Sequence, residues 1–392
     1  MINIIDKYKC CGCGACVNIC PQSCITMIAD IEGFLYPTVN LEKCIRCGLC
    51  EKACVYLLKN KSNRVLDGKI ALGIVNKNEV KRLESSSGGF FYSLAEYVIS
   101  KGGAVYGVSM DEDNKSCSFR RVTSILDLNL IQGSKYIQAN VGCIYKHIKQ
   151  DLIQGKKVLF SGTPCQISGL NSFLNNNYEN LISVEIICHG VPSPKIWKKY
   201  VCYLENKYND TFHRVNFRDK RMGWKEFGLL IEGKEQQYFN TLNKDPFLIM
   251  FLRNYSLRPS CYNCYAKRFE SKADFIIGDF WGVDKCMKNI DDDKGTSLVV
   301  LNTDRAHNLL AGISSFFSIY PVKNEDFLMF NPAIHSSVKE PKRRKRYFYD
   351  STTLSFDVLA NKYCKKNKLG TWINHTFLIR GFRKVMRIIR KK

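Results

Sequence analysis

Apolar residues in the middle of the chain form short runs, separated by stretches in which they recur every three or four positions. Such runs are typical of buried β-strands, and the spaced pattern is typical of amphipathic helices. Residues 90–100 and 142–152 are predicted helices. The predicted strands are residues 70–75, 103–109, 157–161, 181–187, 275–277 and 297–301. Because strands and helices alternate, we predict an α/β domain over residues 65–335.

The start of the chain follows a different pattern, which is set by cysteines. The spacing C-x2-C-x2-C-x3-C occurs twice, at Cys10, Cys13, Cys16 and Cys20 and again at Cys44, Cys47, Cys50 and Cys54. In two-cluster ferredoxins, three cysteines of each loop bind one 4Fe-4S cluster and the fourth binds the other cluster. The spacing therefore predicts one cluster on Cys10, Cys13, Cys16 and Cys54. The second cluster is predicted on Cys44, Cys47, Cys50 and Cys20.

Zinc is the alternative ligand for paired CxxC cysteines. Clusters are favoured because a zinc site does not require a fourth cysteine at the same offset in both halves. Cys11 could compete with Cys10 as a ligand, but Cys10 keeps the three-residue rhythm. Residues 25–39 are predicted to form a hairpin that turns at Glu32 and Gly33. These features predict an α+β ferredoxin-like domain with two 4Fe-4S clusters over residues 1–60.

The cysteine content bears on the compartment of the protein. The chain has 19 cysteines in 392 residues. We find no apolar signal segment at its start and no apolar run near the ~18 residues that a membrane span needs. Cluster ligands must be thiolates, which a reducing environment maintains. We therefore predict a cytoplasmic protein that carries electrons.

Most of the net charge of +23 lies at the end of the chain, where residues 339–392 hold 17 Lys and Arg against three acidic residues. We predict a basic helical C-terminal tail over residues 336–392. Within it, apolar residues recur at helical spacing among basic ones, at Leu378, Phe382, Val385, Met386 and Ile389. Such a helix suits peripheral contact with an anionic membrane at its inner face. The alternatives are packing on the α/β domain or on a partner protein.

Four glycine-containing turns lie where predicted strands and helices meet, at residues 85–89, 133–136, 162–165 and 278–282. In α/β folds, phosphate-bearing ligands bind at turns of this kind. None of the four is a GxGxxG fingerprint or a P-loop, and each one taken singly is an ordinary turn. Together, their hydroxyls, backbone amides and one lysine suit a phosphate-bearing flavin.

Four further cysteines lie at or near the same strand ends, namely Cys165, Cys188, Cys261 and Cys264. Cysteines at strand ends of one sheet can converge although they are far apart in sequence. Four thiolates, two of them spaced as CxxC, suit a third cluster or a zinc ion. Buried free cysteines are the alternative for Cys165 and Cys188.

The motifs occur in a fixed order along the chain. They are SSGG at 86–89, GSKY at 133–136, GTPCQ at 162–166, CHGVP at 188–192, CxxC at 261–264 and GDFWG at 278–282. With the N-terminal cysteines, this set resembles the coenzyme F-420 hydrogenase/dehydrogenase beta-subunit family, in its form with an N-terminal ferredoxin domain. The resemblance covers residues 1 to about 335. It specifies the family but not the substrate, because members differ in substrate.

The resemblance implies an α/β flavoprotein domain that binds FAD and a third 4Fe-4S cluster. The cluster cysteines of the family match Cys165, Cys188, Cys261 and Cys264. The flavin-contacting turns match Ser86, Ser87, Gly88, Gly89, Gly133, Ser134, Lys135, Tyr136, Gly162, Thr163 and Pro164. Cys286, near Trp281, is a substitute candidate for a cluster ligand.

These cofactors predict an oxidoreductase. Clusters pass single electrons, whereas a flavin collects two and can exchange them as a hydride. We expect electrons to move between a redox partner protein or reduced ferredoxin, the clusters, FAD and a small-molecule substrate. The alternative is an electron-transfer subunit that feeds a partner enzyme. A nucleic-acid role is not expected, because the charge lies in the tail and no recognised module is present.

Two further features are weaker candidates. His189 directly follows Cys188 and could assist with protons near the flavin, or it could only hydrogen-bond a loop carbonyl. Residues 217–224 mix charged and aromatic side chains. That stretch could meet an anionic substrate, or it could be a solvated turn with one buried Trp.

Overall fold

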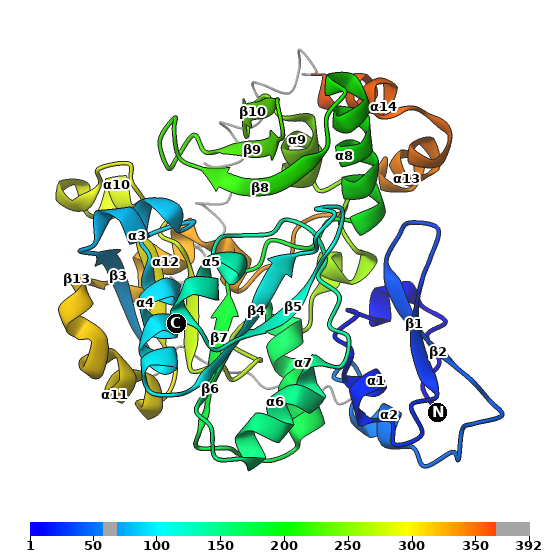
Figure 1. Cartoon of the computed structure of the whole chain (residues 1–392), viewed down its shortest axis with the longest axis horizontal. Helices are drawn as coiled ribbons and strands as arrows, with labels where there is room; N and C mark the ends of the chain where they lie inside the picture. The colour runs from blue at the N-terminus through cyan, green and yellow to red at the C-terminus, as the bar shows by residue number, and fades with distance from the viewer. Residues whose placement is uncertain (58–68, 366–392) are drawn as a thin grey trace, which may run out of the picture.

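The computed structural model describes residues 1–57 and 69–365, and its first part is a ferredoxin-type unit (Figure 1). Its elements are η1 (Lys7–Lys9), α1 (Ala15–Ile19), β1 (Ile25–Ala29), β2 (Leu35–Val39) and α2 (Leu49–Lys52). β1 and β2 form the predicted hairpin, which pairs antiparallel. Gly14 and Gly48 precede the two helices, each with φ +74°. Glycine tolerates this left-handed conformation, so the chain can turn sharply from each cysteine loop into its helix.

The centre of the molecule is a mixed eight-stranded sheet with the order β13-β3-β12-β11-β7-β6-β4-β5. Strands β4, β6, β7 and β11 run parallel, whereas β5, β12, β3 and β13 join antiparallel. The bounds are β3 (Ile70–Asn76), β4 (Ala104–Met110), β5 (Cys117–Val122), β6 (Val158–Gly162), β7 (Leu181–Ile186), β11 (Phe275–Asp279), β12 (Ser297–Leu301) and β13 (Phe317–Val322). All six strands predicted for this domain are present.

The two strands that the apolar pattern missed are the edges of this sheet. β5 contains Arg120 and Arg121, and β13 contains Pro321. Edge strands are only half covered, so they carry charged residues or proline in place of a continuous apolar run. The central strands could be predicted because they are buried on both faces and therefore consist of continuous apolar runs.

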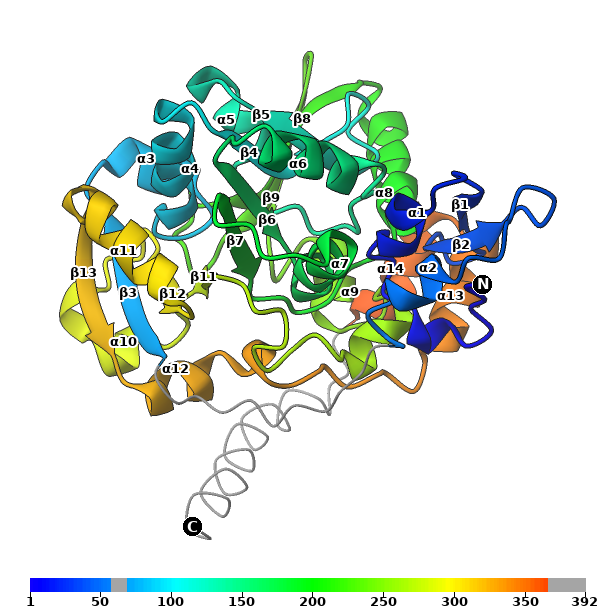
Figure 2. The same cartoon turned by 90° about the horizontal axis from the view of Figure 1, so that it is seen from below.

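Helices cover both faces of the large sheet (Figures 1 and 2). α4 (Phe90–Ser100) and α11 (Asp304–Ile313) pack on the face that includes Val105 and Leu159. α6 (Ile144–Ile153) and α7 (Pro164–Leu174) pack on the opposite face. Shorter elements complete this domain: α3 (Glu79–Glu84), η2 (Ile125–Asp127), α5 (Leu128–Ile131), η3 (Pro259–Asn263), α10 (Val283–Cys286), η4 (Lys288–Ile290), η5 (Ser314–Phe316), α12 (Asn324–Phe330) and η6 (Pro332–Ile334).

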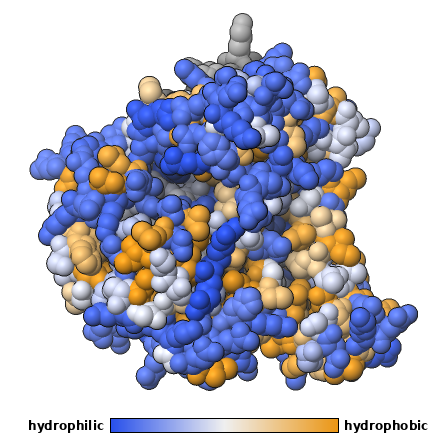
Figure 3. Space-filling view, viewed as in Figure 1, coloured by the Kyte–Doolittle hydropathy of each residue, from blue (hydrophilic) through white to orange (hydrophobic). Residues whose placement is uncertain are grey.

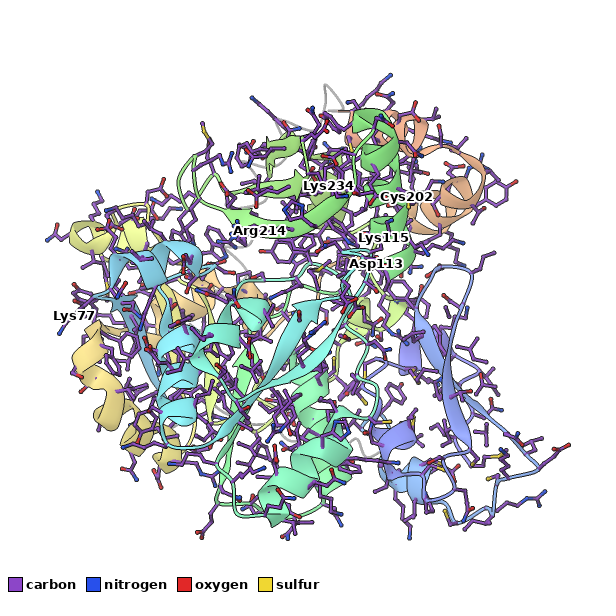
Figure 4. The ribbon with its side chains drawn as sticks, in the orientation of Figure 1. Lys77, Asp113, Lys115, Cys202, Arg214 and Lys234 are labelled. Atoms are coloured by element: carbon purple, nitrogen blue, oxygen red, sulfur yellow. The ribbon has the colours of Figure 1, made fainter. Side chains whose placement is uncertain are left out.

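A second, three-stranded antiparallel sheet was not predicted from the sequence. It has the order β10-β9-β8. The bounds are β8 (Phe212–Asp219), β9 (Gly228–Gly233), β10 (Gln237–Thr241), with α8 (Pro194–Tyr208) before the sheet and α9 (Pro246–Leu252) after it. The turn between β4 and β5 holds α8, since Lys115 Nζ lies 2.8 Å from a Glu205 carboxylate oxygen (Figure 4). The indole of Trp197 donates to the Asn114 carbonyl at 2.8 Å, so the small sheet is fastened to the large one.

Part of the expected C-terminal tail belongs to the folded body. α13 (Arg344–Thr353) and α14 (Phe356–Cys364) bury Tyr347 and Phe356 in the core that also contains α8. The amphipathic helix predicted beyond residue 373 lies outside the described residues. Within residues 1–57 and 69–365, no helix is long and apolar enough to cross a membrane.

The ferredoxin-type unit lies beside α7 and α13 (Figure 2). Arg344 of α13 forms a paired contact with the Glu32 carboxylate, with N···O distances of 3.0 and 2.5 Å. Ser193 at the start of α8 donates to the Glu32 carbonyl. The tip of the ferredoxin hairpin is thus held by residues from two distant parts of the chain.

Candidate metal centres and the adjoining turns

The second predicted ferredoxin cluster corresponds to a hollow in the structure. Its lining includes all four predicted ligands, Cys20, Cys44, Cys47 and Cys50. Cys47 is exposed at the surface, and the Cys50 sulfur accepts a hydrogen bond from the Ile2 amide at 3.3 Å. The donor set and the hollow fit a 4Fe-4S cluster, which takes four thiolates.

Cys24 also lines this hollow, although the spacing argument gave it no role. Its sulfur lies 3.4 Å from that of Cys20. The contact with Cys20 and burial raise the pKa of the Cys24 thiol to about 11. No local pattern marks Cys24, because it lies outside the repeated spacing.

The cysteines predicted for the first ferredoxin cluster are neighbours. Burial, together with the nearby thiols of Cys10 and Cys54, raises the pKa of Cys16 to about 12. The fourth predicted ligand, Cys13, is buried near Cys16. Thiols gathered out of water in this way resist ionisation, and iron removes that cost by binding the thiolate. The donor set therefore fits a cluster.

Arg258 joins this first group to the α/β domain. Its Nε donates to the Cys10 carbonyl at 2.8 Å, and Nη2 donates to the Leu35 carbonyl of β2 at 2.9 Å. Nη2 also lies 3.6 Å from the Cys10 sulfur. The side chain is fully buried and lies over the Tyr36 ring, 4.3 Å from its centroid. A buried positive charge therefore lies directly beside a predicted cluster ligand.

The four inner cysteines converge although they come from three separate segments. Cys165 lies in the first turn of α7, Cys188 follows β7, and Cys261 and Cys264 lie in and just after η3. Burial raises the pKa of Cys188 to about 12 and that of Cys264 to about 11. The Cys188 thiol also raises the pKa of Cys264, Cys261 raises that of Cys188, and Cys264 raises that of Cys165, so these thiols are neighbours.

A lysine accompanies the inner cysteines. Lys267 is buried and its ammonium donates to the carbonyls of Cys188 and Ala333, both at 2.6 Å. Within residues 1–57 and 69–365, no three His, Cys, Asp or Glu side chains are arranged to hold a single metal ion. Each thiolate of a 4Fe-4S cluster binds its own iron atom, so a cluster site is recognised by neighbouring thiols that surround a larger group.

Cys11 lies beside the group that contains Cys10. Its sulfur is 3.3 Å from the Tyr265 hydroxyl, and its other neighbours include Cys13 and Cys165. Cys10 has Arg258 and Cys54 beside it, and Cys11 is also a neighbour of Cys54. Cys10 as the ligand of the first cluster therefore stays a prediction from the spacing.

Two of the predicted flavin turns are in direct contact. The Ser86 hydroxyl accepts from the Ser134 amide at 2.7 Å and is 2.9 Å from the Ser134 hydroxyl. The turn at residues 162–164 instead begins α7, where the Thr163 hydroxyl is 3.3 Å from the Cys165 sulfur. The turns at 86–89 and 133–136 thus lie against each other, while the turn at 162–164 borders the inner cysteines. The surface is hollowed between the small sheet and α5, which leads into the second turn (Figure 3).

Arg218 of β8 connects the turns at 86–89 and 133–136. The sequence placed it only in a stretch of mixed charged and aromatic residues and gave it no specific role. Its guanidinium donates to Tyr136 Oη at 3.1 Å, to the Ser86 carbonyl at 3.2 Å and to both Asp279 carboxylate oxygens. The side chain is buried, yet its Nε has no partner. Trp224 donates to Asp279 at 2.9 Å and stacks on Trp281 at 5.0 Å between ring centroids. The stretch 217–224 therefore contacts three of the predicted turns, at Ser86, Tyr136 and Asp279.

Two lysines border the turns. The Lys135 ammonium donates to carbonyls of its own turn, including Gln132 at 2.7 Å, and burial lowers its pKa to about 8. Lys220 donates to the Ser87 carbonyl at 2.8 Å, and burial together with nearby Arg218 lowers its pKa to about 7. Each ammonium, when protonated, donates to three carbonyls, so it could bind a phosphate only by exchanging one of those partners for it.

Two weaker candidates lie apart from these contacts. His189 Nε2 is 2.6 Å from Asn254 Oδ1, so the ring is held by a side-chain amide and not by a loop carbonyl. Burial lowers the His189 pKa. Cys286 packs beside Trp281 and has Asp326 and Asp284 as its acidic neighbours. None of the contacts described for Cys286 joins it to the inner cysteines.

Comparison with known proteins finds two family models that match separate parts of the chain. Residues 9–57 match the 4Fe-4S dicluster domain, and residues 155–318 match the family model for the C-terminal part of the coenzyme F420 hydrogenase/dehydrogenase beta subunit. The class is therefore that of iron–sulfur electron-transfer proteins. Within it, the chain carries a C-terminal domain of the coenzyme F420 hydrogenase/dehydrogenase beta-subunit family together with an N-terminal 4Fe-4S dicluster domain.

Individual relatives match parts of the chain. An uncharacterized protein of Methanocaldococcus jannaschii is 24% identical over 205 residues, which are 45% of this chain and 56% of that protein. The methylamine utilization ferredoxin-type protein MauM of Methylobacillus flagellatus is 38% identical over 81 residues, 19% of this chain and 34% of that protein. The chain thus covers about half and about a third of these two relatives.

One solved structure aligns with most of the chain. It is a chain of the F420-reducing nickel–iron hydrogenase complex from Methanosarcina barkeri, studied by xenon derivatization. The alignment covers 72% of this chain and 90% of that chain, with 12% identity and a TM-score of 0.47.

Proposed function

We propose that this protein is an iron–sulfur flavoprotein oxidoreductase with three 4Fe-4S clusters and one FAD. Electrons pass between the two ferredoxin-type clusters, the inner cluster, FAD and an organic substrate. The observation that carries the proposal is the contact between the ferredoxin-type unit and α7. A Cβ at Gly169 of α7 would lie 2.9 Å from Cys13 Cβ and 3.1 Å from its sulfur. The first turn of that same helix carries Cys165.

The order of the centres follows from their exposure. Cys47 of the second cluster set is exposed, whereas Cys13 of the first set is buried against α7. Exposed apolar side chains lie in the same ferredoxin-type unit, at Ile28, Leu41 and Ile45. An exposed apolar patch is a common docking site for a partner protein. We therefore assign electron exchange with a redox partner to the second cluster.

FAD, when bound, would collect single electrons from the clusters and exchange two of them at once with a substrate. The residues that would hold it are those of the turns at 86–89 and 133–136. Their hydroxyls and amides suit phosphate oxygens, and Arg218 supplies a buried charge whose Nε is unpaired. Gly133 has open space around its Cα, so a ligand can approach the backbone there. The turn at 162–164 would face the flavin from the side of the inner cluster.

A second function is an electron-transfer subunit without a substrate of its own. Two observations favour it: the matching family model is named for a beta subunit, and the ferredoxin-type unit has the exposed apolar side chains described above. In this case a partner enzyme would complete the reaction. The two functions are separated by asking whether the chemically reduced protein alone turns over a small molecule.

The test is anaerobic purification followed by analysis of iron, sulfide and flavin. Three clusters predict about twelve irons per chain, together with one flavin. Eight irons without flavin would leave only the ferredoxin part of the proposal. Twelve irons without flavin would retain the inner cluster and favour the electron-transfer subunit.

A further inference from the structure

Cys11 and Tyr265 lie where the first ferredoxin site adjoins the inner site, since Tyr265 has both Cys13 and Cys165 as neighbours. Cys11 and Tyr265 both pack on the small apolar cluster formed by Cys13, Ala15, Ala53 and Val55. The Cys11 sulfur and the Tyr265 hydroxyl are 3.3 Å apart. Tyr265 directly follows Cys264, and Cys11 directly follows Cys10. Cys11 is thus bonded in the chain to a ligand of the first cluster, and Tyr265 is bonded to a ligand of the inner cluster. The two side chains contact each other.

The position of Cys11 is fixed from several sides. Its carbonyl accepts from Gln138 Nε2 at 3.1 Å, and Gln138 Oε1 accepts from Arg258 at 2.8 Å. The Tyr265 ring meets the Tyr56 ring edge to face, with centroids 6.3 Å apart. The thiol of Cys11 has the sulfurs of Cys13 and Cys165 as hydrogen-bonding neighbours. Its sulfur thus has a predicted ligand of each site as a neighbour.

We infer that Cys11, supported by Tyr265, is the contact through which electrons pass between the first ferredoxin cluster and the inner cluster. The inference rests on the proposed function. One electron leaves the ferredoxin cluster and one enters the inner cluster, or the reverse. No bond forms or breaks, no proton moves, and Cys11 stays a thiol that binds no iron. The electrons come from a one-electron donor such as reduced ferredoxin.

The structural reason is continuity of contact. Electrons cross a protein more readily through bonded and touching atoms than through gaps. The path Cys13–Cys11–Cys165 runs through three neighbouring sulfur atoms, with Cys11 packed on the cluster that contains Cys13. Sulfur is a highly polarizable atom. The alternative route through Gly169 ends on a residue without a side chain. Removing the Cys11 sulfur therefore opens a gap without removing a ligand.

The experiment uses the full-length, anaerobically reconstituted protein and three variants, Cys11→Ala, Tyr265→Phe and Cys117→Ala. Cys117→Ala is the matched control, because Cys117 is buried in β5 and its sulfur contacts the Ile137 carbonyl. Reduction by a ferredoxin-type donor is followed by stopped-flow absorbance. The phase that belongs to the inner cluster is identified by its loss in Cys261→Ser.

The expected result is a several-fold slower inner phase in Cys11→Ala, a smaller slowing in Tyr265→Phe and none in Cys117→Ala. Iron content should equal that of the parent protein. Spin–spin broadening between reduced clusters, measured by electron paramagnetic resonance, should also be unchanged, because the distance between clusters is kept. An unchanged inner phase overturns the inference. Loss of about four irons from Cys11→Ala also overturns it, because Cys11 is then a ligand. A parent protein without an inner cluster would instead contradict the proposed function.

Discussion

Arg258 Nη2 lies 3.6 Å from the sulfur of Cys10, while Nε of the same guanidinium donates to the Cys10 carbonyl at 2.8 Å. The arginine comes from the loop that leads into η3, and the cysteine comes from the ferredoxin-type unit. The thiolate of Cys10 raises the pKa of Arg258, and burial opposes that rise. A permanent positive charge therefore lies where the reduced first cluster would accumulate negative charge.

Arg258→Gln should lower the midpoint potential of the first ferredoxin cluster. The reduced cluster carries one more negative charge, which the guanidinium stabilises, so its loss favours the oxidised form. The measurement is a redox titration monitored by electron paramagnetic resonance. Arg258→Lys keeps the charge and should shift the potential less. Equal potentials in all three proteins, with full iron content, would show that Arg258 acts only in docking.

Cys261→Ser should remove roughly four irons and leave the two ferredoxin clusters in place, because the inner cysteines form a separate ligand set. Cys165→Ser should do the same. Iron and sulfide analysis measures the loss, and Cys202→Ser, at a partly buried cysteine of α8, is the control. If neither inner variant changes the iron content, these thiols are buried free cysteines.

Arg218→Gln should weaken FAD binding, since the two turns lose the cation that contacts both of them. The flavin-to-protein ratio after gel filtration measures the effect. Tyr136→Phe removes one hydrogen bond and keeps the charge, so it should retain more flavin. Iron content should be unchanged in both variants. A full flavin ratio in Arg218→Gln would place the flavin elsewhere.

Asp245 should make stability depend on pH. It is buried at the start of α9, where it accepts hydrogen bonds from Tyr200 at 2.5 Å and Leu248 at 2.7 Å, and burial raises its pKa to about 6. The folded protein therefore holds a proton that the unfolded chain has already lost between about pH 4 and 6. Stability from this group is present below that range and is lost as the pH rises through about 6.

The measurement is the melting temperature of the parent protein and of Asp245→Asn, between about pH 5 and 7. The parent should become less stable relative to the variant as the pH rises, because the buried carboxylate ionises. The variant cannot ionise at this position. A constant difference between the two proteins across the range would show that Asp245 does not titrate there.

The ferredoxin part could be predicted because its structure depends on residues that are close together in the sequence. Eight cysteines at fixed spacing and the turn after Asp30 determine the loops, helices and hairpin within a few residues. The central strands were also visible, because strands buried on both faces are continuous apolar runs. The helices predicted at residues 90–100 and 142–152 correspond closely to α4 and α6.

The rest depends on contacts between distant residues. β8 and β10 mix polar and aromatic side chains, and β9 has only the three-residue apolar run 229–231, so their pattern does not predict a sheet. The basic run 342–346 suggested a solvated tail, yet Arg344 is buried and Tyr347 and Phe348 follow it into the core. Cys11, Arg218 and Arg258 carry no motif. Their roles follow only from partners that the fold brings to them.

The contact between Glu32 and Arg344 joins positions that are 312 residues apart in the chain. During synthesis, the ferredoxin loops leave the ribosome long before the arginine that fixes the hairpin against the body. The cysteine loops are therefore made while α7 and α13 do not yet exist. This order leaves an interval in which iron and sulfide can be delivered to open loops, and the last helices then close the molecule over the loaded first cluster.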